Sequence, residues 1–245
     1  MKQIMYWFGI IVFLHAACGQ TRPGKVTKTA TDSIYTFVRS RDADGTGKFY
    51  QGREIAPTMS HFGAAWLERA ERLEEERTDL LVKVMAAKVK PTDVIADVGA
   101  GSGYFSFRLA PMVPQGKVLA NDIQPEMLAL INDRKKNSIS KNVETVLGTI
   151  TDPHLPANSV DWVILVDAYH EFSHPHEMMR GIVKALKPTG KVILLEYRAE
   201  DAHVPIKKLH KMTEAQAKKE MRFVGLEWVE TNKTLPWQHL MVFGK

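Results

Sequence analysis

Short apolar runs alternate with longer amphipathic stretches over most of the second half of the chain. Runs that are apolar at nearly every position are typical of strands covered on both faces. They predict strands at residues 94–98, 117–120, 143–147, 162–166, 192–195, 226–229 and 240–243. Helices are expected to follow the first strand as far as residue 109 and to span residues 125–137, 175–186 and 215–221. This alternation predicts an α/β fold with a doubly wound, mostly parallel seven-strand sheet.

The stretch before the first of these strands has a helical pattern. Between Ala64 and Val89, apolar residues such as Trp66 and Leu73 recur at three-to-four spacing. A second helix is expected to begin within this stretch at Thr78 or Asp79. We therefore expect helices on the N-terminal side of the sheet domain that cap its ligand site.

The N-terminus has the pattern of an export signal. Lys2 precedes an apolar run, Ile4–Leu14, that is too short to span a bilayer but fits a signal-peptide core. Two alanines then precede Cys18, and this order resembles a bacterial lipoprotein signal in which the cysteine is lipidated. A plain secretory signal and a buried N-terminal helix are the alternatives. The expected division is a signal peptide (1–17), a flexible tether (18–33), a cap segment with helices (34–90) and the main domain (91–245).

Composition limits the chemistry. The chain has 245 residues, of which 44% are apolar and 25% charged, as in globular proteins. Its single cysteine excludes an intramolecular disulfide and cysteine-rich zinc sites. The net charge of +5 arises from interspersed acids and bases, so we expect no nucleic-acid partner. Asp42 and Asp44 resemble the start of a calcium loop, but Arg53 occupies the position that needs a glutamate, which favours a surface turn.

The candidate chemistry lies in a glycine-rich turn between the first strand and its helix. Gly99, Gly101 and Gly103 allow a tight turn and a close approach of a ligand to the main chain. A dinucleotide fingerprint needs its third glycine where this chain has Tyr104. Asp122, at the end of the second strand, is placed to accept hydrogen bonds from ribose hydroxyls.

This G-x-G-x-G turn, with Asp97 two residues ahead, resembles class I S-adenosylmethionine-dependent methyltransferases. The pairs Leu155-Pro156 and Val160-Asp161, and the turn Lys187–Gly190, are similar to further motifs of that family. The resemblance is strongest to the ubiquinone/menaquinone-type C-methyltransferases and to predicted exported bacterial methyltransferases. It implies a Rossmann-like methyltransferase sheet, the cofactor S-adenosylmethionine and an activity of class EC 2.1.1.

The resemblance also implies residue roles. Asp97 would organise the loop and contact the methionyl amine directly or through water, Asp122 would hold the ribose, and Asp167 would face the sulfonium. Thr149 and Ile150 lie where the family often has a Gly-Asp pair that meets the adenine amine, so adenine recognition differs here. The expected cofactor-binding residues are Asp97, Gly99, Ala100, Gly101, Gly103, Asp122, Ile123, Thr149, Ile150 and Asp167.

One motif points elsewhere. His170 to His174 spells H-E-x-x-H, which binds zinc only on a continuous helix. Pro175 disfavours helical geometry at His174, so we expect no metal here. In the methyltransferase interpretation, Tyr169, His170 and Glu171 are catalytic candidates that face the methyl acceptor. The alternative is that Tyr169 and His170 only satisfy each other or a nearby backbone group.

The sequence therefore predicts an exported, lipid-anchored methyltransferase, periplasmic or on the outer membrane, with a small-molecule and quinone-like acceptor. A non-catalytic S-adenosylmethionine-binding or scaffold protein is the main alternative, and a zinc hydrolase is a remote one. Because S-adenosylmethionine is made in the cytosol, either the donor reaches the outer compartment, the enzyme acts before export, or the domain no longer catalyses. The oligomeric state stays undetermined.

Overall fold

The computed structural model describes residues 34–40 and 42–245. The predicted signal peptide, the tether and Cys18 lie outside these residues. Within the described part of the chain, no helix is both long and apolar enough to cross a membrane.

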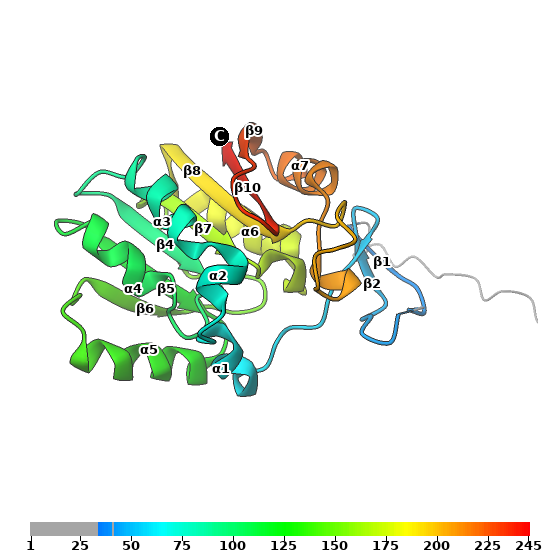
Figure 1. Ribbon diagram of the computed structural model, residues 1–245. Coiled ribbons are helices and arrows are strands. Elements are labelled where there is room, and N and C mark those ends of the chain that lie inside the picture. The colour runs from blue at the N-terminus through cyan, green and yellow to red at the C-terminus, as the bar shows by residue number, and fades with distance from the viewer. Residues whose placement is uncertain (1–33, 41) are drawn as a thin grey trace, which may run out of the picture.

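The central sheet has seven strands in the order β6-β5-β4-β7-β8-β10-β9 (Figure 1). Their bounds are β4 Val94–Val98, β5 Lys117–Asp122, β6 Val143–Leu147, β7 Val160–Val166, β8 Leu186–Tyr197, β9 Glu227–Asn232 and β10 Gln238–Gly244. The first five of these strands in the sheet pair in parallel, whereas β10 runs antiparallel to both β8 and β9. The predicted doubly wound, mostly parallel seven-strand sheet is confirmed.

Alternate residues of the strands face two separate cores, because successive side chains in a strand point to opposite faces. Ile95 and Ile164 belong to one core, and Ala96 and Val163 belong to the other. The first core is covered by α3 (Thr78–Ala86), α4 (Ser106–Leu109) and α5 (Pro125–Asn137). The second core is covered by α6 (Pro175–Ala185) and α7 (Glu214–Phe223). Helices on both faces explain why the central strands β4 and β7 are apolar and buried along most of their length.

The chain before β4 is more complex than its pattern indicates. Residues 35–54 form a small antiparallel sheet of β1 (Tyr35–Phe37), β2 (Lys48–Tyr50) and β3 (Arg53–Glu54), which the sequence did not predict. A segment of chain then leads past the carboxyl edge of the large sheet to η1 (His61–Gly63), α1 (Ala64–Leu67) and α2 (Arg72–Glu76) (Figure 1).

The predicted apolar face of this helical stretch is wrong at Leu73. Leu73 is 50% exposed, whereas Arg72 and Glu76 are 3% and 1% exposed. Arg72 Nε donates to Glu76 Oε2 at 2.9 Å, and Tyr197 Oη donates to Glu76 Oε1 at 2.9 Å. Arg77, with a φ of 52°, ends α2 in the left-handed conformation, and α3 begins at Thr78, one of the two predicted starts of the second helix. The buried Arg72–Glu76 ion pair thus places the charged face of α2, and not its apolar face, against β8.

Candidate functional site

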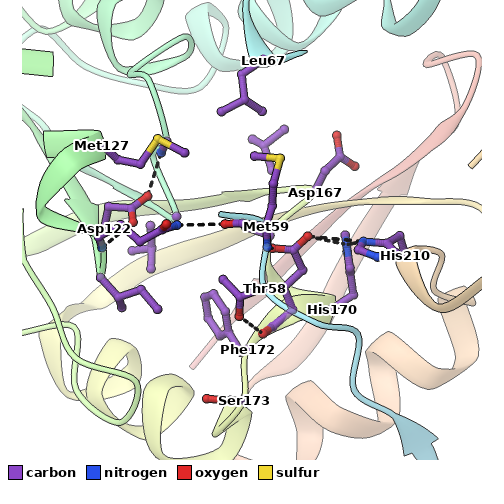
Figure 2. Close-up of a pocket in the computed structure, with 18 of the residues that line it drawn as sticks. Thr58, Met59, Leu67, Asp122, Met127, Asp167, His170, Phe172, Ser173 and His210 are labelled. Atoms are coloured by element: carbon purple, nitrogen blue, oxygen red, sulfur yellow. Dashed lines mark hydrogen bonds and ion pairs between the residues drawn. The ribbon is translucent and has the colours of Figure 1, made fainter. Parts of the chain in front are cut away.

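A cavity of about 440 Å³ lies at the carboxyl ends of β4, β5 and β7 (Figure 2). The order of the sheet reverses between β4 and β7, and open α/β sheets bind ligands at such a switch point. The predicted site residues that line the cavity are Gly99, Gly101, Asp122, Ile123, Thr149, Ile150, Asp167, His170 and Glu171. Residues from both halves of the sequence therefore meet in one site.

The glycine-rich turn forms one wall of the cavity. Gly99 and Gly101 have φ values of +76° and +54°, a region that residues with a Cβ rarely adopt. A Cβ on Gly99 would lie 2.7 Å from Ala168 Cβ, and one on Gly101 would lie 2.5 Å from Leu67 Cδ1. Both positions therefore need glycine to keep the main chain open to the cavity. Gly103 lies behind this wall, where it packs against the core.

Asp122 ends β5 and fixes the turn. Its Oδ2 accepts from the Gly101 backbone N–H at 2.9 Å, and its Oδ1 accepts from the Gln124 N–H at 2.9 Å. Burial raises the pKa of Asp122 despite these backbone hydrogen bonds. The carboxylate lies at the cavity wall, as Figure 2 shows.

Two predicted residues lie behind the turn. Asp97 accepts a hydrogen bond from Ser106 Oγ at 2.6 Å and is 2% exposed. Burial raises the pKa of Asp97 to about 6. Ala100 is also buried, and neither residue is part of the cavity lining. In this structure Asp97 braces the loop from behind.

The wall next to Asp122 is mostly apolar. Ile123 and Met127 line it together with Ile150, which is half exposed at the rim. Thr149 Oγ1 accepts from the backbone N–H of Asp152 at 3.0 Å, so the threonine closes its own turn. The apolar side chains of this wall suit a flat apolar ligand group such as a purine ring. Because the Thr149 side chain bonds within its own turn, the polar edge of such a ring would meet the main chain.

Asp167 lies at the end of β7 with a φ of 49°. Its Oδ2 accepts from Gln238 Nε2 at 3.2 Å, while its Oδ1 is buried with no hydrogen-bond partner among the described residues. Burial raises the pKa of Asp167 well above its usual range. Arg72 and Tyr197 line the cavity beside it. An unpaired buried oxygen of this kind is a strong candidate to meet a ligand.

The other end of the cavity carries a polar cluster. His170 Nδ1 lies 2.5 Å from Glu196 Oε2, and both residues are buried. His170 Nε2 lies 3.1 Å from His210 Nδ1, which in turn lies 3.3 Å from Glu171 Oε1. Burial lowers the pKa of His170, but the charge and hydrogen bond of Glu196 together with the charges of Glu171 and Asp167 outweigh it, so the net shift is upward. Figure 2 shows His170 and His210 side by side at this end.

Tyr169 is absent from this cluster. It is fully buried, and its hydroxyl donates to Glu220 Oε2 at 2.8 Å. The expectation that Tyr169 faces an acceptor is therefore corrected, because the side chain points into the core between the 3-10 turn η3 (Tyr169–Glu171) and α7. The alternative pairing of Tyr169 with His170 is also wrong, since each has another partner.

The H-E-x-x-H segment does not form a continuous helix. His170 and Glu171 lie on a short 3-10 turn, η3 (Tyr169–Glu171), and α6 begins only at Pro175. His174 Nδ1 lies 3.1 Å from Ser173 Oγ, and its ring packs edge-on against Tyr35. The side chains of His170 and His174 thus have different neighbours and do not converge on one metal ion.

A strap of residues 56–61 crosses the cavity. Gln124 Nε2 donates to the Met59 carbonyl at 2.9 Å, and Gln124 Oε1 accepts from the His61 N–H at 2.8 Å. On the other side, Glu171 Oε2 accepts from the Met59 N–H at 2.9 Å. Figure 2 shows Met59 between Asp122 and His210, with its side chain in the cavity. The predicted cap segment therefore contributes directly to the site.

Several residues that line the cavity carry little signal in the sequence. The lining residues that the sequence did not indicate include Met59, Leu67, Arg72, Gln124, Met127, Tyr197 and His210. His210 is a lone histidine on the short turn η4 (Lys208–His210) with no motif around it. Arg72 and Glu76 carry one signal, an oppositely charged pair at i,i+4 spacing.

The site has features that fit an S-adenosylmethionine molecule. The glycine turn presents open main chain, Asp122 offers carboxylate oxygens at the end of the second strand of the domain, and an apolar wall adjoins it. Asp167, whose Oδ1 has no partner among the described residues, and Arg72 also line the cavity and would meet the ammonium and the carboxylate of this cofactor. The donor set therefore matches the groups of this cofactor.

Comparison with known proteins agrees with this fit. A family model described as a methyltransferase domain matches residues 90–241. An uncharacterised methyltransferase-like protein of Schizosaccharomyces pombe is 32% identical over 142 residues, which cover 58% of this chain and 53% of that protein. The ubiquinone/menaquinone biosynthesis C-methyltransferase UbiE of Ectopseudomonas mendocina is 28% identical over 111 residues, 44% of this chain and 43% of that one. The chain thus spans about half the length of the curated relatives it matches.

The fold recurs in solved structures. A SAM dependent methyltransferase from Aquifex aeolicus superposes with a TM-score of 0.70 at 21% identity, over 76% of this chain and 98% of that one. This likeness confirms the Rossmann-like methyltransferase fold. The family match, together with the donor set of the site, identifies S-adenosylmethionine as the cofactor.

Proposed function

The chain belongs to the methyltransferase-domain family, and we propose that it transfers the methyl group of S-adenosylmethionine to a small-molecule acceptor bound at the His170 end of the cavity. One observation carries the proposal: a single cavity joins the glycine turn to a polar cluster. A cofactor held at the turn and an acceptor held at the cluster would therefore be neighbours.

The cofactor supplies an electrophilic methyl group on a sulfonium. The residues of this chain would then bind and orient the acceptor. Gly99, Gly101 and Asp122 would hold the cofactor, and Asp167 would lie between the two ends. Methyl transfer depends mainly on the alignment of nucleophile, methyl and sulfur, so positioning carries most of the catalysis. The strap at Met59 would exclude water from the methyl group.

His170 and Glu171 would position the acceptor. Both line the cavity, and Glu196 fixes the ring of His170 with a second bond from the His170 backbone N–H at 3.2 Å. The apolar side chains Met59, Phe172 and Ile206 complete this end. Such a lining favours a mostly apolar acceptor with one polar group, and the relation to UbiE supports a quinone-like one.

Calorimetric titration with S-adenosylmethionine tests the first half of the proposal. We expect binding that is lost in Gly99→Val, because the new side chain would meet Ala168. Gly225→Ala is a matched control, since Gly225 also has a positive φ but no atom within 4 Å of an added Cβ. A correctly folded protein without binding would refute the proposal.

Incubation with a labelled methyl donor and a metabolite extract tests the second half. Label should appear in a small organic-soluble product and disappear in Gly99→Val. Binding without transfer to any extract would favour the non-catalytic alternative.

We also propose that the chain is exported and lipidated at Cys18. Lys2, the apolar run Ile4–Leu14 and the two alanines before Cys18 support this. If so, the mature domain has no thiol apart from a lipidated one, and its chemistry uses no cysteine at the acceptor.

A further inference from the structure

The polar cluster at the acceptor end contains three side chains whose ligand atoms converge on one point. His170 Nε2, Glu171 Oε1 and His210 Nδ1 lie within 4.8 Å of one another. The pairwise separations are 3.1 Å between the two ring nitrogens, 3.3 Å from His210 Nδ1 to Glu171 Oε1, and 3.8 Å from His170 Nε2 to Glu171 Oε1. Two imidazoles and one carboxylate form the donor set of many catalytic zinc sites.

The separations agree with a tetrahedral ion. Zinc–ligand bonds of about 2.0–2.1 Å set donor atoms roughly 3.3–3.4 Å apart along the edges of a tetrahedron. The three distances in the cluster scatter around this value. Since all three residues line the cavity, the fourth position of such an ion would open onto it.

Hydrogen bonds alone leave one of the two short contacts of His210 Nδ1 without a well-directed proton. Glu196 Oε2 takes the Nδ1 proton of His170, so a neutral His170 presents a lone pair on Nε2. His210 Nδ1 then faces two acceptors, His170 Nε2 and Glu171 Oε1, and its single N–H cannot point at both. If His170 carries both protons, the lone pair of His210 Nδ1 instead faces the Glu171 carboxylate. A cation shared by the three atoms satisfies all of them.

The surroundings of His170 match those of a metal ligand. Metal-bound histidines usually donate their second N–H to a carboxylate, which fixes the tautomer. Glu196 is fully buried and accepts from both the ring and the backbone N–H of His170. Glu171 contributes Oε1 to the cluster, while its Oε2 holds the strap at Met59. An ion at this point would therefore also fix one end of the strap.

We propose that His170, Glu171 and His210 bind one divalent transition-metal ion, Zn²⁺ in preference to Fe²⁺, with its open position toward the acceptor. Nitrogen donors disfavour Mg²⁺ and Ca²⁺, which take oxygen ligands. Zinc is favoured over iron by the general order of affinities. The location of the open position at an acceptor rests on the proposed function, whereas the metal site itself does not.

Zinc titration of chelator-stripped protein in competition with a chromophoric chelator tests the proposal. We expect one zinc per chain, a loss of affinity of at least about 100-fold in His210→Ala, and a loss of about 10- to 100-fold in Glu196→Gln. His203→Ala is the matched control, because His203 is a neighbouring histidine whose side chain is 99% exposed. Unchanged zinc affinity in His210→Ala, or no stoichiometric uptake by the unaltered protein, would overturn the proposal.

A second variant identifies the ligand directly. In a Cys18→Ser background, His210→Cys loaded with Co²⁺ should show a thiolate-to-cobalt charge-transfer band that the Cys18→Ser parent lacks. Absence of this band in a cobalt-loaded, folded variant would contradict ligation at position 210. S-adenosylmethionine binding is measured on the unaltered protein as well. Cofactor binding without stoichiometric metal uptake refutes only the metal site, and metal uptake without cofactor binding refutes only the proposed function.

Discussion

Arg53 joins the small N-terminal sheet to the main domain through a buried ion pair. Its Nε and Nη2 donate to the two oxygens of Glu220 at 2.8 and 2.9 Å, and its Nη1 donates to the His170 carbonyl at 3.0 Å. The side chains of Arg53 and Glu220 are 9% and 0% exposed. Burial lowers the pKa of Arg53, but the charge of Glu220, its hydrogen bonds and the other acidic groups nearby together outweigh burial, so the net shift is upward. We use Arg53→Met as the perturbation because it keeps the apolar stem and removes the charge.

The expected cost is large because Glu220 stays behind as a buried charge. Removing one partner of a buried ion pair typically costs about 3–5 kcal/mol. Tyr169 and Gln216 still donate to Glu220, which holds the carboxylate in place but does not neutralise it. Arg53→Met combined with Glu220→Gln should therefore cost less than Arg53→Met alone, since glutamine carries no charge and its single amide oxygen still accepts one of these two hydrogen bonds.

Urea unfolding measures these effects. With a slope of about 2 kcal/mol/M, Arg53→Met should lower the midpoint by about 1.5–2.5 M. Lys117→Ala is the control, because the Lys117–Glu144 pair is exposed at 43% and 51% and such pairs contribute about 0.2–1 kcal/mol. A loss below about 1 kcal/mol in Arg53→Met, or a double variant weaker than the single one, would refute the reasoning.

Three further predictions follow from single contacts. Burial raises the pKa of Asp97 to about 6 from the ordinary 3.8, so the folded state holds this proton more tightly and stability falls as the pH rises between these values. The free energy of unfolding, measured between pH 4 and pH 7, should therefore fall less in Asp97→Asn than in the unaltered protein, by up to about 3 kcal/mol. An equal fall in the two proteins would contradict this assignment. Gln124→Ala should weaken S-adenosylmethionine binding about 10-fold in calorimetry by freeing the strap at Met59, whereas exposed Gln115→Ala should not; equal affinities would show that the strap is not needed. Cys18→Ser should abolish lipid labelling and membrane retention in cells, and retained label would exclude lipidation at this residue.

The sheet domain is predictable because its signals are local. β4, β6 and α5 have the bounds that periodicity indicates, and Pro125 begins α5 at its first helical position. The glycine turn was recognisable because only glycine tolerates its positive φ values next to a crowded wall. Asp122 followed from its place at the end of an apolar run.

The N-terminal segment was predicted less well because its residues are fixed by distant partners. The apolar pattern assigned Leu73 to the buried face, but Arg72 and Glu76 are buried instead, because they pair with each other and Tyr197 on β8 donates to Glu76. Tyr169 was adjacent in sequence to true lining residues, yet η3 turns it toward Glu220. A neighbour in the chain can thus belong to another environment in space.

The sequence by itself determined the α/β alternation, the cofactor turn and the acid that braces it, because each depends on residues within one turn or one strand. Only the tertiary structure decided which side chains share the acceptor end. His210 reaches His170 across forty positions of sequence, and Glu196 reaches it from the neighbouring strand β8. Such a cluster has no sequence spacing to detect, since the sheet register and the docking of η4 bring its members together.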